Sequence, residues 1–418
     1  MADNWTDPPA ARALLARRLA EAAPARLQIV AGPRQVGKTT LLLDLARDLG
    51  HAAHYVACDD PAVALPGAWD RLWDEAEARA RRRPAVLLLD EIQYLPDWAR
   101  RLKARWDRLQ RERVPLHVVA TGSSALRLGR GSPETLAGRF ERLVLAHWSP
   151  PTLAQAFDLS PADAALEYVL RGAYPGAFAH RTDPARWRAY VRDAIVEPAI
   201  GRDLLALRPI RRPSLLRQVF AVAVGSPAEI VSLQKLQGTL GGRGALETIA
   251  EYLRLLEEAF LVAPLAKYSP RAARRRAAPP KLVTLNSALL AATDPEGPPD
   301  PTRDRARFGR WLENACLARA WNAGEQVTYW REEPLEVDGV VEGRWGRWAI
   351  EITTGRVDAA TLRGLLEFCR RYPGFRPLVV TEPGVQVRQP GVAGVDWVSF
   401  LTNPPLGEPA PAADAPRA

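Results

Sequence analysis

The most constraining feature of this 418-residue chain is the run Gly32-Pro33-Arg34-Gln35-Val36-Gly37-Lys38-Thr39. It follows the apolar segment 27–31 and opens the segment 39–49, whose leucines recur at helical spacing. Backbone N–H groups at a helix N-terminus attract phosphate oxygens, and glycines let the backbone approach them closely. The pattern Gly-x4-Gly-Lys-Thr between a strand and a helix therefore predicts a phosphate-binding loop (P-loop) over residues 32–40.

ATP and Mg²⁺ are the ligands that this loop predicts. The Lys38 ammonium group would span the β- and γ-phosphates, the Thr39 hydroxyl would ligate magnesium, and Thr40 would complete the ATP-binding run. The alternative is a glycine-rich turn with a chance lysine. Because the chain has only five lysines, at positions 38, 103, 235, 267 and 281, chance is the weaker explanation.

Two further segments favour nucleotide hydrolysis. The apolar run 86–89 is followed by Asp90 and Glu91, and ligands of open α/β sheets bind at the carboxyl ends of strands. Asp90 suits the magnesium shell, and Glu91 suits activation of the attacking water. The run 116–120 ends in Thr-Gly-Ser-Ser, where the Ser123 hydroxyl would touch the γ-phosphate or the water. The alternatives are an acidic turn and a Ser/Thr turn.

The pattern of apolar segments divides the chain into three domains and a tail. Strands alternating with helices over 1–148 predict an α/β fold, a P-loop NTPase with a doubly wound parallel sheet. Residues 149–293 read as helical and end in a helix, strand, basic loop and strand, the order of a winged helix. Residues 305–400 form a last α/β segment, and the Pro/Ala-rich residues 403–418 predict a disordered tail.

Charge and composition bear on partners and compartment. The net charge is +9, which suits either nucleic-acid contact or a solvated arginine-rich surface. The three cysteines are far apart and no long apolar stretch occurs, so we expect a cytoplasmic protein that does not meet a membrane. A DNA-contacting wing is expected to use the basic side chains of one loop, which are Lys267, Arg271, Arg274, Arg275, Arg276 and Lys281. A solvated charge run is the alternative.

Several motifs together resemble a bacterial and archaeal family of AAA+ ATPases that carry a C-terminal region of unknown function. Besides the P-loop, they are Leu89–Gln93, Thr121–Ser124, Leu136–Arg139, Leu170–Pro175, Tyr252–Val262, Arg310–Asn314, Tyr329–Arg331 and Glu336–Asp338. The resemblance implies an ATPase core, a winged-helix part and a domain like the PD-(D/E)xK restriction-endonuclease fold. It also implies that Ser123 is sensor 1 and that Arg139 contacts the γ-phosphate, in cis or from a neighbouring subunit. A surface ion pair is the alternative for Arg139.

Three acids are candidates for a vestigial nuclease metal site in the C-terminal domain. A hairpin across Gly343–Gly346 would put Asp338 opposite Glu351, and Glu313 on the preceding helix would be a third ligand. The nuclease motif requires a lysine at position 353, where a threonine stands, and no lysine follows Lys281. Arginine stays charged and substitutes poorly in proton transfer. We therefore expect a structural or DNA-binding relic.

Three functions remain open. The leading hypothesis is an Mg-dependent ATPase of AAA+ type that acts on a nucleic-acid or protein partner, with homo-oligomers a further option. The second is a nucleotide-dependent regulatory DNA-binding protein with little hydrolysis. The third is a metal-dependent nuclease with an ATPase module.

Overall fold

The computed structural model describes residues 4–122, 136–204, 210–242, 244–271 and 278–403. They fall into two compact units. The first unit comprises residues 1–147 together with 197–210, and the second comprises 148–196 together with 211–418. The sequence predicted three domains, whereas the packing assigns 197–210 to the first unit and groups residues 148–196 with the rest of the chain.

The first unit contains one parallel sheet with the strand order β1-β6-β2-β5-β4-β3. Its strands are β1 (Asn4–Thr6), β2 (Leu27–Ala31), β3 (Ala53–Ala57), β4 (Ala85–Asp90), β5 (Leu116–Gly122) and β6 (Phe140–Leu145). Its helices are α1 (Pro8–Leu19), α2 (Lys38–Leu49), α3 (Ala68–Ala80) and α4 (Trp98–Glu112), with short turns η1 (Gly50–Ala52), η2 (Pro61–Ala64), η3 (Ile92–Tyr94) and η5 (Ala199–Leu204).

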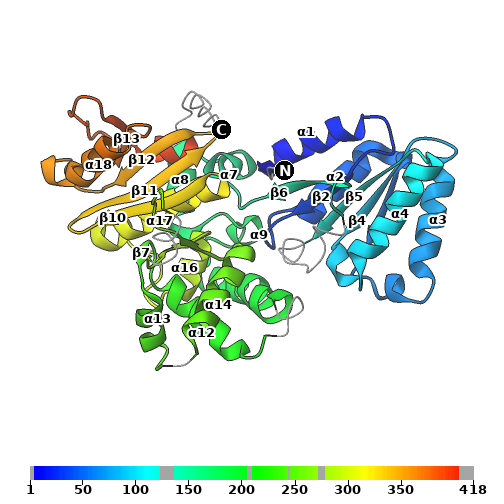
Figure 1. Cartoon of the computed structure of the whole chain (residues 1–418), viewed down its shortest axis with the longest axis horizontal. Coiled ribbons are helices and arrows are strands. Elements are labelled where there is room, and N and C mark those ends of the chain that lie inside the picture. Colours follow the sequence, from blue (N-terminus) through cyan, green and yellow to red (C-terminus); the bar gives the residue numbers. More distant parts are fainter. Residues whose placement is uncertain (1–3, 123–135, 205–209, 243, 272–277, 404–418) are drawn as a thin grey trace. The chain divides into compact units, whose positions relative to one another are not determined.

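Burial of both sheet faces explains why the central strands are apolar throughout. All residues of β2, β4 and β5 are buried. Residues of α3 and α4 pack on one face, against Ile29, Leu87 and Val118, and right-handed crossovers place α2 on the other (Figure 1). The predicted doubly wound parallel sheet is confirmed. Strands β1 and β6 were not predicted.

The strand order brings three predicted segments to one edge of the sheet. β5 lies between β2 and β4, and all three strands run in the same direction. The P-loop after β2, the acids at the end of β4 and Thr121 in β5 therefore meet at the carboxyl edge.

The second unit combines helices with two sheets. Its helices are α7 (Pro150–Phe157), α8 (Pro161–Arg171), α9 (Pro175–Phe178), α10 (Pro184–Tyr190), the π-helical turn η4 (Val191–Val196), α12 (Pro213–Val224), α13 (Leu233–Thr239), α14 (Leu246–Glu258), α16 (Ser287–Thr293), α17 (Arg305–Asn322), α18 (Ala359–Arg371) and α19 (Trp397–Thr402). The smaller sheet is antiparallel, in the order β7-β9-β8, and consists of β7 (Glu229–Ile230), β8 (Val262–Leu265) and β9 (Lys281–Thr284).

The larger sheet has the order β10-β11-β12-β13-β14. Its strands are β10 (Gln326–Glu332), β11 (Leu335–Gly343), β12 (Gly346–Ile352), β13 (Arg376–Thr381) and β14 (Ala393–Asp396). β10, β11 and β12 are antiparallel, and α18 then connects β12 to the parallel strand β13. The pairs run from Gly343↔Gly346 to Gly339↔Ile350, which confirms the predicted hairpin. The paired residues end before Asp338 and Glu351, and β11 is irregular there in its pairing with β10, so the predicted pairing of these two acids stays a prediction.

Candidate nucleotide site and the acidic cluster of the second unit

The P-loop turns sharply between β2 and α2 because two glycines permit it. Gly37 has φ 96°, and a Cβ atom there would meet nothing within 4 Å, so its outer side is open. A Cβ atom on Gly32 would lie 2.1 Å from the carbonyl oxygen of Leu145, at the end of β6. Gly32 is therefore required by the close approach of two backbones, and Gly37 by the left-handed conformation.

Lys38 is buried at the first turn of α2. Its side chain is 5% exposed, and its Nζ donates hydrogen bonds to the carbonyl oxygens of Gly32 (3.1 Å) and Pro33 (2.7 Å). Burial lowers the pKa of Lys38, while the nearby charge of Glu91 raises it. Thr39, Thr40 and Gln35 are exposed on the same loop, and Val36 is buried in the core.

The two acids of β4 lie at the same edge. Asp90 is 3% exposed, and its carboxylate accepts hydrogen bonds from the Tyr55 hydroxyl (3.0 Å) and from the Thr121 hydroxyl. The backbone N–H of Glu91 donates to Thr121 Oγ1 (3.2 Å), and the Gln93 amide contacts the Glu91 carboxylate. A carboxylate offers about four acceptor sites, so Asp90 keeps lone pairs for a cation or its water shell. The oxygen donors of Thr39 and Asp90 fit magnesium, which prefers such ligands.

A contact that the sequence analysis missed holds the P-loop from outside. Arg34 forms a two-point ion pair with Asp203 of η5: Nη2 lies 2.5 Å from Oδ1, and Nε contacts Oδ2. The Arg34 Nη2 is also 3.4 Å from the Tyr94 hydroxyl, and the Arg202 guanidinium lies 4.9 Å from the centre of the Tyr94 ring. No sequence pattern pointed to Asp203, because 169 positions separate it from its partner.

Arg139 lies elsewhere in the first unit. It immediately precedes β6, and its carbonyl oxygen accepts the N–H of Leu27, the first residue of β2, so it stands at the amino edge of the sheet. Its Nε donates to Asp107 (2.8 Å), and its guanidinium lies over the Trp106 ring. This place does not match a γ-phosphate contact within one chain, and a role toward a neighbouring subunit stays a prediction. Ser123 lies outside the described residues.

The expected basic wing is partly wrong. Lys281 opens β9 and is 1% exposed, so it cannot contact a phosphate backbone. Lys267 is half-buried, and Arg271 is exposed. Arg274, Arg275 and Arg276 lie outside the described residues. Lys281 was assigned to the wing because it ends a run of basic residues, but a position in a strand buries its side chain.

Lys281 instead lies among the acids of the predicted nuclease site. Its Nζ is 2.5 Å from Glu313 Oε1, 3.4 Å from Asp338 Oδ1 and 3.5 Å from Glu336 Oε1. Asp338 Oδ2 accepts the N–H of Ile352, and the charge of Asp338 acts on Glu351, whose pKa it raises. No lysine follows position 281 in the sequence, and Lys281 was assigned to the wing, so it was not predicted that β9 supplies a lysine to these acids from 57 positions before Asp338.

The charge balance of this acidic cluster decides how well it fits a metal. Burial raises the pKa of Glu313 and of Glu351, with repulsion from Asp338 as the next cause, and Lys281 opposes it. The surrounding acids raise the pKa of Lys281. In the described part of the chain, no three His, Cys, Asp or Glu side chains are arranged to hold a metal ion. The ammonium group stands where a cation would stand, so Glu313, Asp338 and Glu351 do not fit a metal as arranged.

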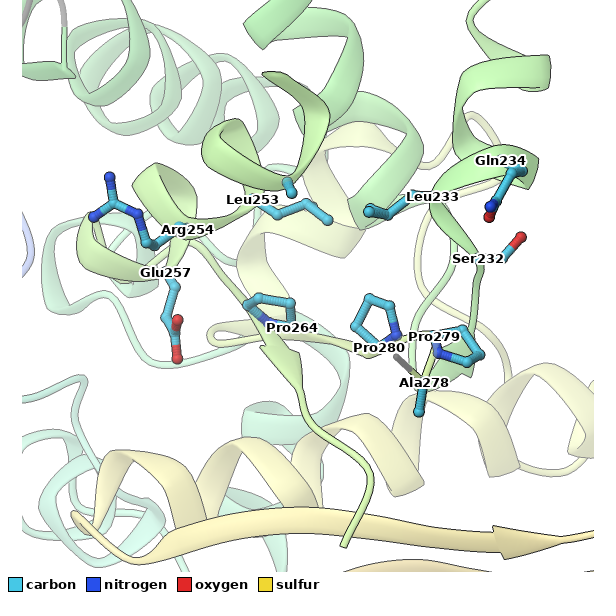
Figure 2. A pocket seen from close by; sticks show the side chains of 11 residues that line it. Ser232, Leu233, Gln234, Leu253, Arg254, Glu257, Pro264, Ala278, Pro279 and Pro280 are labelled. Carbon is cyan, nitrogen blue, oxygen red and sulfur yellow. The ribbon is translucent and has the colours of Figure 1, made fainter. Parts of the chain in front are cut away.

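The exposed face of α14 is acidic. Glu247, Glu251 and Arg254 are its exposed charges, and Arg254 pairs with both Glu258 and Glu251. A cavity of about 390 Å³ lies beside this helix. Figure 2 shows its lining, in which Pro264, Pro279 and Pro280 face Leu233 and Leu253, with Arg254 and Glu257 at one end. Neither the helix face nor the cavity presents the unpaired basic side chains that a nucleic-acid surface needs.

Comparison with known proteins assigns two segments of the chain. Residues 25–150 match an AAA domain family, and residues 162–299 match a domain family of unknown function, DUF8612. No curated protein matches the chain. The first segment covers the P-loop and every strand of the sheet except β1, in agreement with the P-loop fold described above.

Solved structures of P-loop proteins show a weaker likeness. The RuvB Holliday junction branch migration motor of Thermotoga maritima is 20% identical, with 63% of this chain and 89% of that chain covered and a TM-score of 0.32. The Aeropyrum pernix ORC1 protein in complex with DNA is 16% identical, with 68% and 90% covered and a TM-score of 0.32. AMPPCP-bound DnaA from Aquifex aeolicus is 14% identical, with 59% and 86% covered and a TM-score of 0.32.

Among the helices of the described residues, none is both long enough and apolar enough to cross a bilayer. Residues 25–150, which contain the P-loop and the strands β2 to β6 of the parallel sheet, thus match the AAA domain family.

Proposed function

We propose that the first unit binds and hydrolyses ATP with Mg²⁺. One observation carries the proposal: the neighbouring parallel strands β2, β5 and β4 end at the same edge of the sheet. The side chains placed at that edge are Lys38, Thr121, Asp90 and Glu91. The AAA domain match of residues 25–150 supports it.

Each residue has a role that follows from its chemistry. The Lys38 ammonium, now bonded only to neutral carbonyl groups, would exchange them for phosphate oxygens, which are stronger acceptors. Magnesium, held by Thr39 and through Asp90, would neutralise charge on the phosphates. Glu91 would orient and deprotonate water. Its backbone N–H donates a hydrogen bond to the Thr121 hydroxyl, which holds the Glu91 backbone in position.

Turnover by wild type and by Glu91→Gln tests the proposal. We expect wild type to release phosphate from Mg-ATP and Glu91→Gln to bind ATP with little change, while turnover falls about a hundredfold because a general base contributes that much. Equal turnover would remove Glu91 as the base. Binding without turnover in wild type would favour the regulatory alternative.

For the work that hydrolysis does, the second unit supports a protein partner better than DNA. The order α12, β7, α13, α14, β8, β9 is that of a winged helix, and a winged helix reads DNA with the helix in the position of α14. The exposed face of α14 carries paired charges and an excess of glutamate, which repels phosphate. We propose that a winged-helix module here binds protein. Salt-sensitive stimulation of turnover by duplex DNA would contradict this.

A further inference from the structure

The contact between Arg34 and Asp203 joins the P-loop to a distant piece of chain. The two-point geometry is the strongest form of a side-chain ion pair, because two parallel N–H···O bonds fix both distance and orientation. Asp203 is only 7% exposed, and Arg34 is about one quarter exposed, so solvent screens the pair weakly. Burial lowers the pKa of Arg34, but the hydrogen bond and charge of Asp203 outweigh it, so the guanidinium stays charged.

The position of Arg34 within the loop gives this pair a mechanical role. Arg34 stands between Gly32 and Gly37, in the stretch whose backbone N–H groups must surround the phosphates. Its neighbour Gln35 has φ 62°, a left-handed conformation that few non-glycine residues adopt. An anchor on Arg34 restricts the backbone on either side of it. The Tyr94 hydroxyl and the Arg202 guanidinium over the Tyr94 ring complete that anchor.

The connectivity of the chain links this ion pair to the second unit. Residues 197–210 belong to the first unit, yet the chain before them, 148–196, and the chain after them, 211–418, belong to the second. The residue that holds the P-loop therefore sits on a segment connected at both ends to the second unit.

We propose that Asp203 positions the P-loop through Arg34, and that the described residues 197–204 transmit nucleotide occupancy between the loop and the second unit. The inference rests on the proposed function, since it requires that the loop binds ATP. Asp203 is a positioning residue, because it acts on the nucleotide only through Arg34.

Nucleotide affinity in matched variants tests the positioning role. Asp203→Asn keeps the shape of the side chain and removes its charge, and Asp48→Asn is the control, because Asp48 pairs with Arg12 on an exposed surface of the same unit. We expect Asp203→Asn to weaken binding of a fluorescent ATP analogue about tenfold and Asp48→Asn to leave it unchanged. Arg34→Lys, which loses the two-point geometry, should weaken binding likewise. If Asp203→Asn unfolds, Arg34→Lys decides the question.

Coupling separates positioning from a general effect on folding. The double variant Arg34→Ala/Asp203→Ala should bind the analogue no more weakly than the worse single variant, because both remove one contact. Additive losses, or unchanged or tighter binding in Asp203→Asn, would overturn the positioning role. If wild type fails to bind ATP, the proposed function itself is wrong. If wild type binds ATP and Asp203→Asn binds it equally well, only the positioning role of Asp203 is wrong.

Hydrogen exchange of the full chain tests the transmission. In wild type, saturation with the non-hydrolysed analogue should change amide exchange in α10 and α12, the helices that flank the segment on each side. In Asp203→Asn, measured at analogue concentrations that restore full occupancy, that change should disappear. An identical change in both proteins, or none in wild type, would refute transmission through this segment.

Discussion

The chain buries two of its five lysines, one in each unit, and their surroundings differ in kind. In the described residues, no carboxylate lies within ion-pair distance of Lys38 Nζ, which bonds to two backbone carbonyls, whereas Lys281 Nζ lies within 3.5 Å of three carboxylates. Burial accordingly lowers the pKa of Lys38, and the acids raise that of Lys281. A buried ammonium group without an acidic partner indicates a site for an anion; one with its acidic partners in place indicates a neutralised interior.

Removing Lys38 should have the largest effect of the changes considered, and it tests the role of this lysine in binding phosphate. We expect Lys38→Ala to lower ATP turnover and affinity by at least about a hundredfold, because it removes the ammonium group that would bind the phosphates. Lys103→Ala is the control, since Lys103 is a partly exposed lysine of the same unit that pairs with Asp107. Affinity for a fluorescent ATP analogue measures the effect, and unchanged affinity would end the account of the site.

Removing the second lysine should change stability. Lys281→Met keeps the length of the side chain and leaves the acids uncompensated, so we expect a loss of about 3–5 kcal/mol in the free energy of unfolding of the second unit. Urea denaturation measures it. The double variant Lys281→Met/Asp338→Asn should recover part of the loss, because it removes the aspartate charge that Lys281 had balanced. ATP affinity should not change in either variant.

The acidic cluster should also make stability depend on pH. Glu313 and Glu351 have raised pKa values, about 8 and about 10, so the folded chain keeps protons that the unfolded chain releases above the ordinary pKa of 4.5. Stability from this source is present at low pH and falls as the pH rises through those values. We expect the melting temperature of the second unit to fall between pH 6 and pH 9, and to fall less in Glu351→Gln. A wild type and variant with parallel profiles would contradict the raised pKa of Glu351.

The smallest expected effect concerns metal. Without nucleotide, millimolar Mn²⁺ or Mg²⁺ should leave the melting temperature of wild type unchanged, as should EDTA, because Lys281 already provides the positive charge. In Lys281→Met, Mn²⁺ should raise the melting temperature, and Asp338→Asn in that background should abolish the increase. If Mn²⁺ raises the melting temperature of wild type and Asp338→Asn abolishes that increase, the acids do hold a metal.

Local pattern accounts for what the sequence could predict. The P-loop, β2, β4 and β5 are recognisable because apolar runs, glycines and acids follow one another within about ten residues, and parallel strand order then places them together. The hairpin of β11 and β12 followed from its turn glycines in the same way.

Contacts between distant segments account for what it could not. Arg34 and Asp203 are 169 positions apart, and nothing near Asp203 distinguishes it from other acids on helices. Lys281 was misassigned because its neighbours 267–276 are basic, although it opens an apolar run that reads as a strand. The rarity of lysine in this arginine-rich chain was a usable signal, since two of the five lysines, Lys38 and Lys281, are buried at sites of dense charge or hydrogen bonding.

The tight fit at Gly32 has a consequence for how the first unit tolerates change. The carbonyl of Leu145 leaves no room for a methyl group, and only two residues, Ala146 and His147, separate Leu145 from the point where the chain first enters the second unit. The P-loop thus contacts the end of β6 at Gly32, and it pairs with Asp203 of η5 at Arg34. Even alanine at position 32 would have to displace the end of β6. That displacement would disturb the nucleotide site and also residues 146–148, where the chain passes from the first unit to the second.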